Sequence, residues 1–437
     1  MCFSKLKSFI SISFLLSLSF IIAPQCTADA KTNAKTNYLT FTVETDSASF
    51  GIVNHNGNNP NIEYSLDGGK RWITLSNGTL VVLKKGKVDK ALLRGVNSEG
   101  FSKSDEYTYT NFVMSGRIIA SGSVMSLIDG CGESTEIKGE RCFAWLFENC
   151  ISLIQAPQLP ATTLTKACYN RMFQYCSNLE NAPDLPATSL AKACYSRMFQ
   201  DCGNLKKAPK LPATTLSEFC YSMMFFRCIN LEQAPQLPAT TLAEGCYEGM
   251  FQCCENLRKT PELPATTLAE DCYIGMFSYC TNLTQVPQLP ATTLAKGCYR
   301  GMFKRCTSLT YAPELPATAL INVCYDGMFS ECHRLNMIKV GFTSWEMEHT
   351  SSDETESENQ DEFLDSDIPT PEGPIPPSEM NINVDVKQLN KEKEQTDWST
   401  YNWLSNVATN GIFICPKELP QEFGKDKIPN GWKVVNE

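Results

Sequence analysis

A unit of 26 residues occurs eight times in succession, without an insertion, in the middle of this 437-residue chain. A second cysteine follows eight residues after the first in every copy, from Cys150 to Cys332. The first cysteines are Cys142, Cys168, Cys194, Cys220, Cys246, Cys272, Cys298 and Cys324. A unit this short cannot bury an apolar face on its own, so the copies are expected to stack, each contacting only its neighbours.

A fixed period of roughly 20–29 residues with leucines at set offsets is typical of leucine-rich repeats. We therefore predict a right-handed α/β solenoid over residues 130–345. In one copy, residues 179–186 should be extended. Residues 194–202 should form a short helix, because Cys194, Met198 and Cys202 lie four apart and would share one helix face. The recurring proline, Pro183 in this copy, lacks an N–H donor, so the strand ladder should be short and interrupted once per coil.

The N-terminal residues 1–30 have the pattern of a secretory signal peptide. Lys5 and Lys7 precede the apolar run 9–22, and the small residues 28–30 follow it. Export to the medium or the outer cell surface is expected. A lipid anchor at Cys26 is a weaker alternative, because the residues before it, Ala-Pro-Gln, do not fit lipoprotein processing. No later segment is apolar enough for a transmembrane helix.

Short alternating runs between residues 38 and 129 predict an antiparallel β-sandwich. The expected strands are residues 38–43, 61–66, 71–75, 79–83, 89–95, 107–113 and 118–121. Asp67, Gly68 and Gly69 stand between two of these runs and predict a hairpin. The sequence thus places an all-β domain before the repeats.

The segment 346–395 differs in composition from the rest of the chain. Twelve acidic residues and no lysine or arginine lie between Glu346 and Met380, which outweighs the formal net charge of −10. We predict a disordered acidic, proline-containing insert here, and no nucleic-acid partner. Apolar residues such as Trp403 and Phe413 return after it, so residues 396–437 are expected to form a closing segment.

The sequence resembles the leucine-rich repeat surface proteins of the Bacteroides surface protein A type. The resemblance rests on Leu-Pro-Ala-Thr-Thr-Leu at residues 237–242, followed by Cys-Tyr-x-Gly-Met-Phe-x-x-Cys at residues 246–254. Residues 62–72 and 115–129 resemble the N-terminal β domain of that family, and residues 402–432 its closing segment. The resemblance implies a secreted or surface-exposed bacterial protein whose usual activity is adhesion or binding of host proteins.

The sixteen repeat cysteines allow three interpretations. Cys194 and Cys202 on one helix would be about 12 Å apart at 1.5 Å per residue, beyond disulfide reach. Equivalent cysteines in adjacent coils would be about 4.8 Å apart, wider than the usual disulfide Cβ separation of about 3.8 Å. Metal binding lacks a Cys-x-x-Cys spacing. Buried thiols that pack as small apolar groups are therefore favoured, with regular disulfides as the alternative. Cys253 falls at a usually polar position and could be an exposed thiol.

Catalytic motifs are not evident in the sequence. The only histidines are His55, His333 and His349, and Cys332 beside His333 belongs to a buried column, which argues against a nucleophile–base pair. The acidic run 353–362 lacks the glycine and the spacing of a calcium-binding EF-hand. We therefore expect no enzymatic activity, no cofactor and no metal ion.

The variable positions of the repeats are the candidate ligand surface. Lys206, Lys207 and Lys210, with Arg258 and Lys259 two coils on, form a basic cluster beside the strand. Phe219, Met223 and Phe226 could form an exposed apolar patch. The expected function is that of an adhesin, or a binding module for an extracellular protein or glycan. The alternative is an envelope or biofilm scaffold that acts by self-association.

Overall fold

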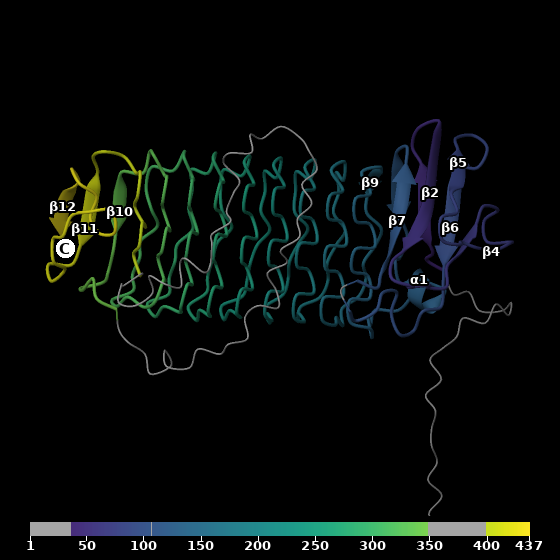
Figure 1. The fold of residues 1–437 in the computed structure, drawn as a ribbon, viewed down its shortest axis with the longest axis horizontal. Coiled ribbons are helices and arrows are strands. Elements are labelled where there is room, and N and C mark those ends of the chain that lie inside the picture. The colour runs from purple at the N-terminus through teal and green to yellow at the C-terminus, as the bar shows by residue number, and fades with distance from the viewer. Residues whose placement is uncertain (1–35, 106, 348–398) are drawn as a thin grey trace, which may run out of the picture.

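A computed structural model describes residues 36–105, 107–347 and 399–437. In Figure 1 two small β-sheets stand at one end, a long row of coils follows, and a third small sheet stands at the other end. Within the described residues the one α-helix is the single turn α1 (Ser126–Asp129). Accordingly, no helix of this part of the chain has the length and apolar character needed to cross a membrane.

The N-terminal unit consists of two sheets packed face to face. The larger has the order β4 (Ile73–Thr74), β3 (Glu63–Ser65), β6 (Lys90–Arg94), β1 (Leu39–Val43), β8 (Ile118–Ser121) and β9 (Leu153–Gln155). The smaller has the order β5 (Val81–Lys84), β2 (Ser47–Asn54) and β7 (Thr110–Ser115). The ring of Phe41 on β1 meets those of Phe50 and Phe112 edge-on at 5.1 Å, which joins the two sheets through their apolar faces.

Strand β2 is the one strand of this unit that the sequence analysis missed. Ala48, Phe50 and Ile52 alternate along it and are buried, so the two-residue period was present. The strand pairs with β5 on one side and β7 on the other, which makes it the centre of the smaller sheet.

The larger sheet continues directly into the repeats. Strand β9 belongs to the first coil and pairs in parallel with β8, with Leu153 opposite Ile118. The carbonyl of Leu146 accepts a 2.8 Å hydrogen bond from the Phe112 N–H, so the smaller sheet also adjoins the first coil. The N-terminal unit therefore caps the stack and covers the core of its first coil.

The predicted helix in each copy is wrong. Residues 194–202 form a succession of four-residue turns, because Ala193, Arg197 and Asp201 have left-handed φ angles of 52°, 55° and 59°. The backbone N–H groups alternate between two directions: Ser196 donates to Ala193 in its own coil at 3.2 Å, whereas Arg197 donates to Ser222 in the next coil at 2.9 Å. A left-handed residue at every fourth position cannot continue an α-helix, so the stack is built without helices and the α/β prediction fails.

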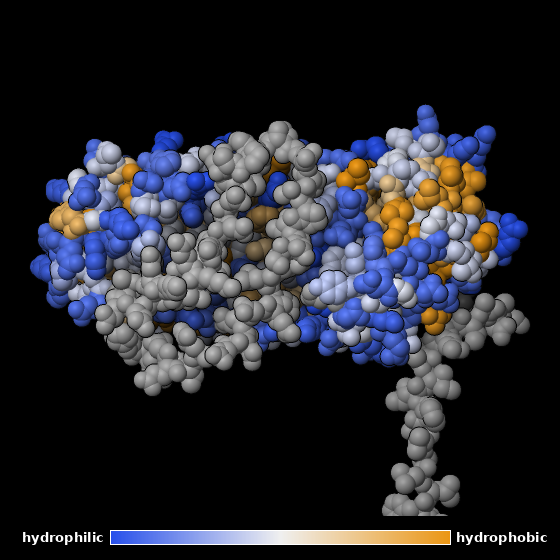
Figure 2. All heavy atoms as spheres, in the orientation of Figure 1, coloured by the Kyte–Doolittle hydropathy of each residue, from blue (hydrophilic) through white to orange (hydrophobic). Residues whose placement is uncertain are grey.

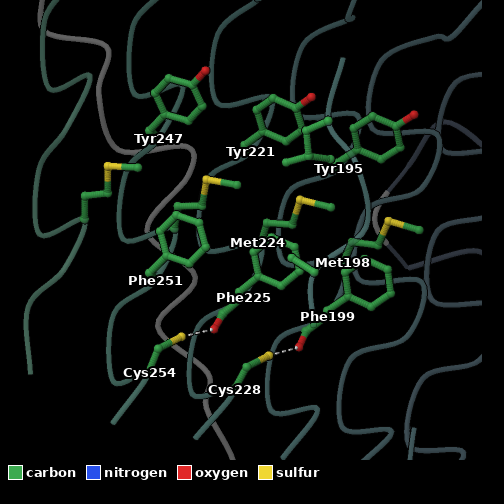
Figure 3. Close-up of a cluster of buried hydrophobic side chains, with 14 of the residues drawn as sticks. Tyr195, Met198, Phe199, Tyr221, Met224, Phe225, Cys228, Tyr247, Phe251 and Cys254 are labelled. Carbon is green, nitrogen blue, oxygen red and sulfur yellow. Dashed lines mark hydrogen bonds between the residues drawn. The ribbon is translucent and has the colours of Figure 1, made fainter. Parts of the chain in front are cut away.

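The core of the stack consists of continuous columns of identical side chains (Figure 3). Tyr195 lies parallel to Tyr221 with ring centroids 5.8 Å apart, and Phe199 lies parallel to Phe225 at 5.6 Å. The leucine, cysteine, tyrosine, methionine and phenylalanine columns are buried in the copies. This confirms the prediction that the repeated apolar positions point inward, and each added coil extends the tyrosine column and the phenylalanine column by one stacked ring.

On the extended side of the coils the hydrogen-bond ladder between strands is interrupted, as predicted from the recurring proline. Between successive copies it is reduced to isolated parallel bridges, such as Lys207 with Gln233 and Lys259 with Gln285. Where the proline is absent, β10 (Met337–Lys339) forms a short strand. It begins a parallel sheet with β11 (Ile412–Cys415) and β12 (Lys433–Asn436).

The segment that starts at Ser399 completes a ninth coil. Its backbone carbonyls accept hydrogen bonds from the preceding copy, as those of another repeat would. The N–H of Tyr325 donates to the carbonyl of Ser399 at 2.9 Å, and the N–H of Phe329 donates to the carbonyl of Trp403 at 2.8 Å. Asn402 has a left-handed φ of 48°, which matches the turn positions of the repeats. The predicted insert 346–395 falls within this coil, and apart from Glu346 and Met347 it lies outside the described residues.

Candidate functional site

The stack has two long exposed sides, which differ in backbone conformation. We call them the strand face and the turn face. The strand face consists of the exposed residues of the extended segments, for example Lys206, Lys207 and Lys210 in one copy. The turn face consists of the outward residues of the four-residue turns, for example Arg197 and Asp201. Both faces are rows of the same position in successive coils, so a residue's neighbours along the stack are 26 residues away.

The three lysines of the predicted basic cluster are all exposed on the strand face. No ion pair joins Lys206, Lys207 or Lys210 to another residue of the described part of the chain. The corresponding residues before and after Lys206 in the stack are Glu180 and Glu232. The charge at this position therefore alternates from Glu180 to Arg258, which places the three lysines between two acidic residues.

Arg258 and Lys259 lie on the same face but not beside the three lysines. They are exposed, and Lys259 forms its bridge with Gln285. The intervening coil carries Glu232 and Gln233 at the equivalent positions. The two basic groups therefore stand two coils apart on one face.

The three apolar candidates lie on the turn face and are half-buried instead of exposed. A Cβ added to Gly245 in the next coil would stand 2.3 Å from the Phe219 ring. A Cβ added to Gly249 would stand 3.2 Å from Cγ of Met223. These side chains therefore pack on glycines of the neighbouring coil, and that packing accounts for Phe219 and Met223 without a ligand. Phe226 is half-buried as well.

The repeat cysteines are buried, and none of them forms a disulfide within the described residues. In the second column, from Cys176 onward, each Sγ–H donates to the phenylalanine carbonyl of the preceding coil, as Cys228 does to Phe199 at 3.1 Å and Cys254 to Phe225 at 3.2 Å (Figure 3). Cys150 donates instead to the carbonyl of Phe112 in β7, at 3.1 Å. Burial raises the pKa of the Cys168 thiol to about 12. A cysteine acts as a nucleophile or as a metal ligand in its thiolate form, which a raised pKa disfavours. The cysteine columns therefore suit a structural role.

The remaining cysteine candidates show no catalytic arrangement. Cys253 is half-buried, and burial raises the pKa of its thiol to about 11. Cys332 donates to the carbonyl of Phe303 at 3.0 Å, whereas Nδ1 of His333 lies 2.8 Å from the carbonyl oxygen of Asn406. The two neighbours in sequence thus contact different partners. In the described ranges no three His, Cys, Asp or Glu side chains are grouped to hold a metal ion.

The turn face carries acidic side chains that are partly buried. Burial raises the pKa of Asp271 to about 6 and that of Glu248 above its usual range. Glu248 accepts a 3.0 Å hydrogen bond from Ser222 in the preceding coil, and Asp201 pairs with Arg227 of the following coil at 3.1 Å. The polar turn-face residues therefore join adjacent coils, which is a structural role.

Two threonine columns were overlooked by the sequence analysis, although their repetition was visible. The two columns contain Thr188, Thr214 and Thr240, and Ser189, Thr215 and Thr241; these residues are exposed. Their backbones form bridges between coils, for example Ser189 with Thr215. Repetition along this chain therefore does not by itself mark a residue as buried.

Comparison of the chain with protein-family models, with curated proteins and with solved structures finds no match. The function is therefore argued from the chain's own residues.

Proposed function

We propose that the protein is a secreted or cell-surface binding protein without enzymatic activity, a leucine-rich repeat solenoid that acts as an adhesin or as a protein- or glycan-binding module. The observation that supports this is a contrast between two sets of positions. The buried columns repeat from copy to copy, whereas strand-face residues such as Glu180, Lys206 and Glu232 change. One core thus supports different chemistry along its length, as in repeat proteins that bind extended partners.

Export is the second part of the proposal. It rests on residues 1–30, whose charged start, apolar run and small-residue end are those of a signal peptide. These residues lie outside the described part of the chain. Export also agrees with the resemblance to Bacteroides-type surface proteins.

The first place to test for a partner is the group Lys206, Lys207 and Lys210. Three exposed ammonium groups without an ion pair to the described residues can attract an acidic surface at long range. Exposed charges act mainly on the association rate and lose their effect as salt rises, because the Debye length is about 8 Å at physiological ionic strength. Partner capture should therefore be salt-dependent.

The experiment compares the chain with a variant that carries Lys206→Glu, Lys207→Glu and Lys210→Glu. Both are used to capture extracellular proteins and arrayed glycans at low and at physiological salt. A matched control carries Lys87→Glu, Lys90→Glu and Lys417→Glu, which makes the same charge change at exposed positions elsewhere. We expect loss of capture in the first variant only. Equal capture by all three proteins would remove the basic group from the proposal, and no partner at all would remove the binding function.

A scaffold that self-associates is the alternative, and one surface favours it. Figure 2 shows apolar residues gathered over β2, β5 and β7 of the N-terminal unit. Leu80 is 61% exposed and Val82 is 52% exposed there, which is the kind of patch that marks protein contacts. Sedimentation of the chain, with Leu80→Ser and Val82→Thr as the perturbed variant, tests this. A monomer at all concentrations would dismiss the scaffold.

A further inference from the structure

The two ends of the stack are closed in different ways. At the N-terminal end the sandwich covers the first coil, because β9 pairs with β8 and the Phe112 N–H donates to the Leu146 carbonyl. At the other end β12 is the outermost strand (Figure 1). It has β11 on one side and, within the described residues, no strand on the other. An open strand edge of this kind is a template for pairing with another chain.

The backbone of β12 divides its hydrogen-bonding groups between these two sides. The Lys433 N–H donates to the carbonyl of Gly411 at 2.9 Å, and the Glu437 N–H donates to the same side. Because successive residues of a strand direct their N–H and C=O groups to opposite sides, those of Val434 and Asn436 point to the open edge. They have no backbone partner in the described part of the chain. The edge therefore presents two donors and two acceptors.

The apolar core is also incompletely covered at this end. Phe413 in β11 is completely buried, whereas Val434, which lies opposite it in β12, is half-buried. Val435 points to the strand face and is 37% exposed. A terminal unit of a solenoid normally carries a capping element with a polar outer face, and no strand of the described ranges follows β12 to provide one. The end therefore suits a partner that adds a strand.

The edges of β4 and β5 are less suited to pairing with another chain. β4 consists of only two residues. Lys84, Lys85 and Lys87 lie at the end of β5, where the chain turns back so that Lys84 bridges Val88. Lysines at a strand edge oppose pairing with a second chain. β12 carries a single lysine, Lys433, at its start, so its edge is the least protected of the three.

We infer that β12 pairs with β12 of a second copy of this chain and joins two stacks end to end in a dimer. Identical strands related by a twofold axis pair in antiparallel orientation. With Val435 at the centre, Val434 of each copy lies opposite Asn436 of the partner subunit. These are hydrogen-bonded pairs, in which the two residues exchange both of their bonds. Every open backbone group of both strands is then satisfied.

The charges at the two ends of β12 fit this register. Lys433 lies opposite Glu437 of the partner subunit, twice by symmetry, and opposite charges across a strand pair stabilise it. The Glu437 carboxylate is held on the strand face by Lys339 at 2.8 Å, whereas no ion pair joins Lys433 to another described residue. A register shifted by two residues would place Lys433 opposite Val435 and lose this attraction. The charges therefore select the register that also pairs every open backbone group.

The dimer is closed at two copies, because each copy has one β12 edge and the contact uses it. It brings two strand faces into one assembly, so a partner with repeated groups can be held at two places. The inference does not depend on the proposed function, because a monomer can still capture a partner through the group Lys206, Lys207 and Lys210.

The experiment measures the mass of the full chain by sedimentation over a wide range of concentrations. We expect a monomer–dimer equilibrium for the wild type. Lys433→Glu and Glu437→Lys each place like charges opposite one another twice, so each should weaken dimerisation about tenfold or more at low salt. An equimolar mixture of these two variants should dimerise again, because every glutamate at the contact then faces a lysine.

Lys417→Glu is the matched control, because it makes the same charge change at an exposed position of the closing segment outside β12. It should dimerise like the wild type. A monomer at every concentration would overturn the inference, as would a dimer that Lys433→Glu does not weaken or that the mixture does not restore. The variant with Leu80→Ser and Val82→Thr leaves β12 unchanged and should keep the dimer, which distinguishes this contact from that of the scaffold.

Discussion

Replacement of Gly275 by alanine tests the local structure of the repeats, because the sign of the effect differs between a helix and a left-handed turn. Gly275 has a φ of +60°, and a Cβ there would meet no atom within 4 Å. An L residue in this conformation costs roughly 1–2 kcal/mol, offset by about 0.4–1 kcal/mol from the stiffer unfolded chain. We therefore expect a loss of about 1 kcal/mol. In a helix, the same change would add about 0.8–1.0 kcal/mol.

The assay is denaturant unfolding of the wild type and the variant, followed by circular dichroism. Gly301→Ala and Gly327→Ala should behave in the same way, because a Cβ at either position also meets open space at positive φ. Gly275→Asn is the control: asparagine tolerates the left-handed region, so its loss should be smaller. Gly245→Ala should lose more, since the new Cβ would collide with the Phe219 ring. An increase in stability for Gly275→Ala would refute the turn structure.

Three further predictions concern thiols, protons and the insert. At about pH 8 a thiol reagent should label Cys253 before the column cysteines, because burial raises the pKa of Cys168 to about 12 but that of Cys253 only to about 11. Labelling is measured by mass spectrometry, and rapid labelling of many thiols in the folded chain would contradict this. Burial raises the pKa of Asp271 from 3.8 to about 6, so its ionisation costs stability as pH rises through about 6. Asparagine tolerates the φ of 52° at this position. Asp271→Asn should therefore raise the melting temperature at about pH 8 and make it depend less on pH. An unchanged dependence of the melting temperature on pH would contradict this. Replacing residues 348–398 by a short Gly-Ser linker should preserve the melting temperature, because the bridge from Leu320 to Met347 and the bond from Tyr325 to Ser399 lie on either side of the gap; a lower melting temperature would show that the insert supports the ninth coil.

The repeat register and the inward columns could be predicted from the sequence because burial is a property of each position. Tyr195, Phe199 and Cys202 recur every 26 residues, and an apolar group that recurs in every unit has to share one core. The strands of the N-terminal unit were also predictable, since residues such as Leu39 and Phe41 alternate with polar ones along β1. Most strands of the N-terminal unit therefore follow from ordinary two-residue periodicity, whereas β11 and β12 of the closing segment were not predicted.

The candidate surface was predicted less well, because exposure depends on what lies in the next coil. Phe219 was expected to be exposed, but Gly245 in the next coil has no side chain, so the Phe219 ring packs against its backbone. Lys206 and Arg258 lie two coils apart with Glu232 between them, a spacing already visible in the sequence.

The sequence alone determined that this chain is a stack of equal units with a shared core, and which side chains enter that core. The conformation of each unit was decided by the tertiary structure. A spacing of four between Cys194, Met198 and Cys202 fits an α-helix and a series of four-residue turns equally well. The choice between them depends on where the backbone N–H groups find acceptors, and here every second one, such as that of Arg197, donates to the neighbouring coil. That acceptor is supplied only when the copies are stacked.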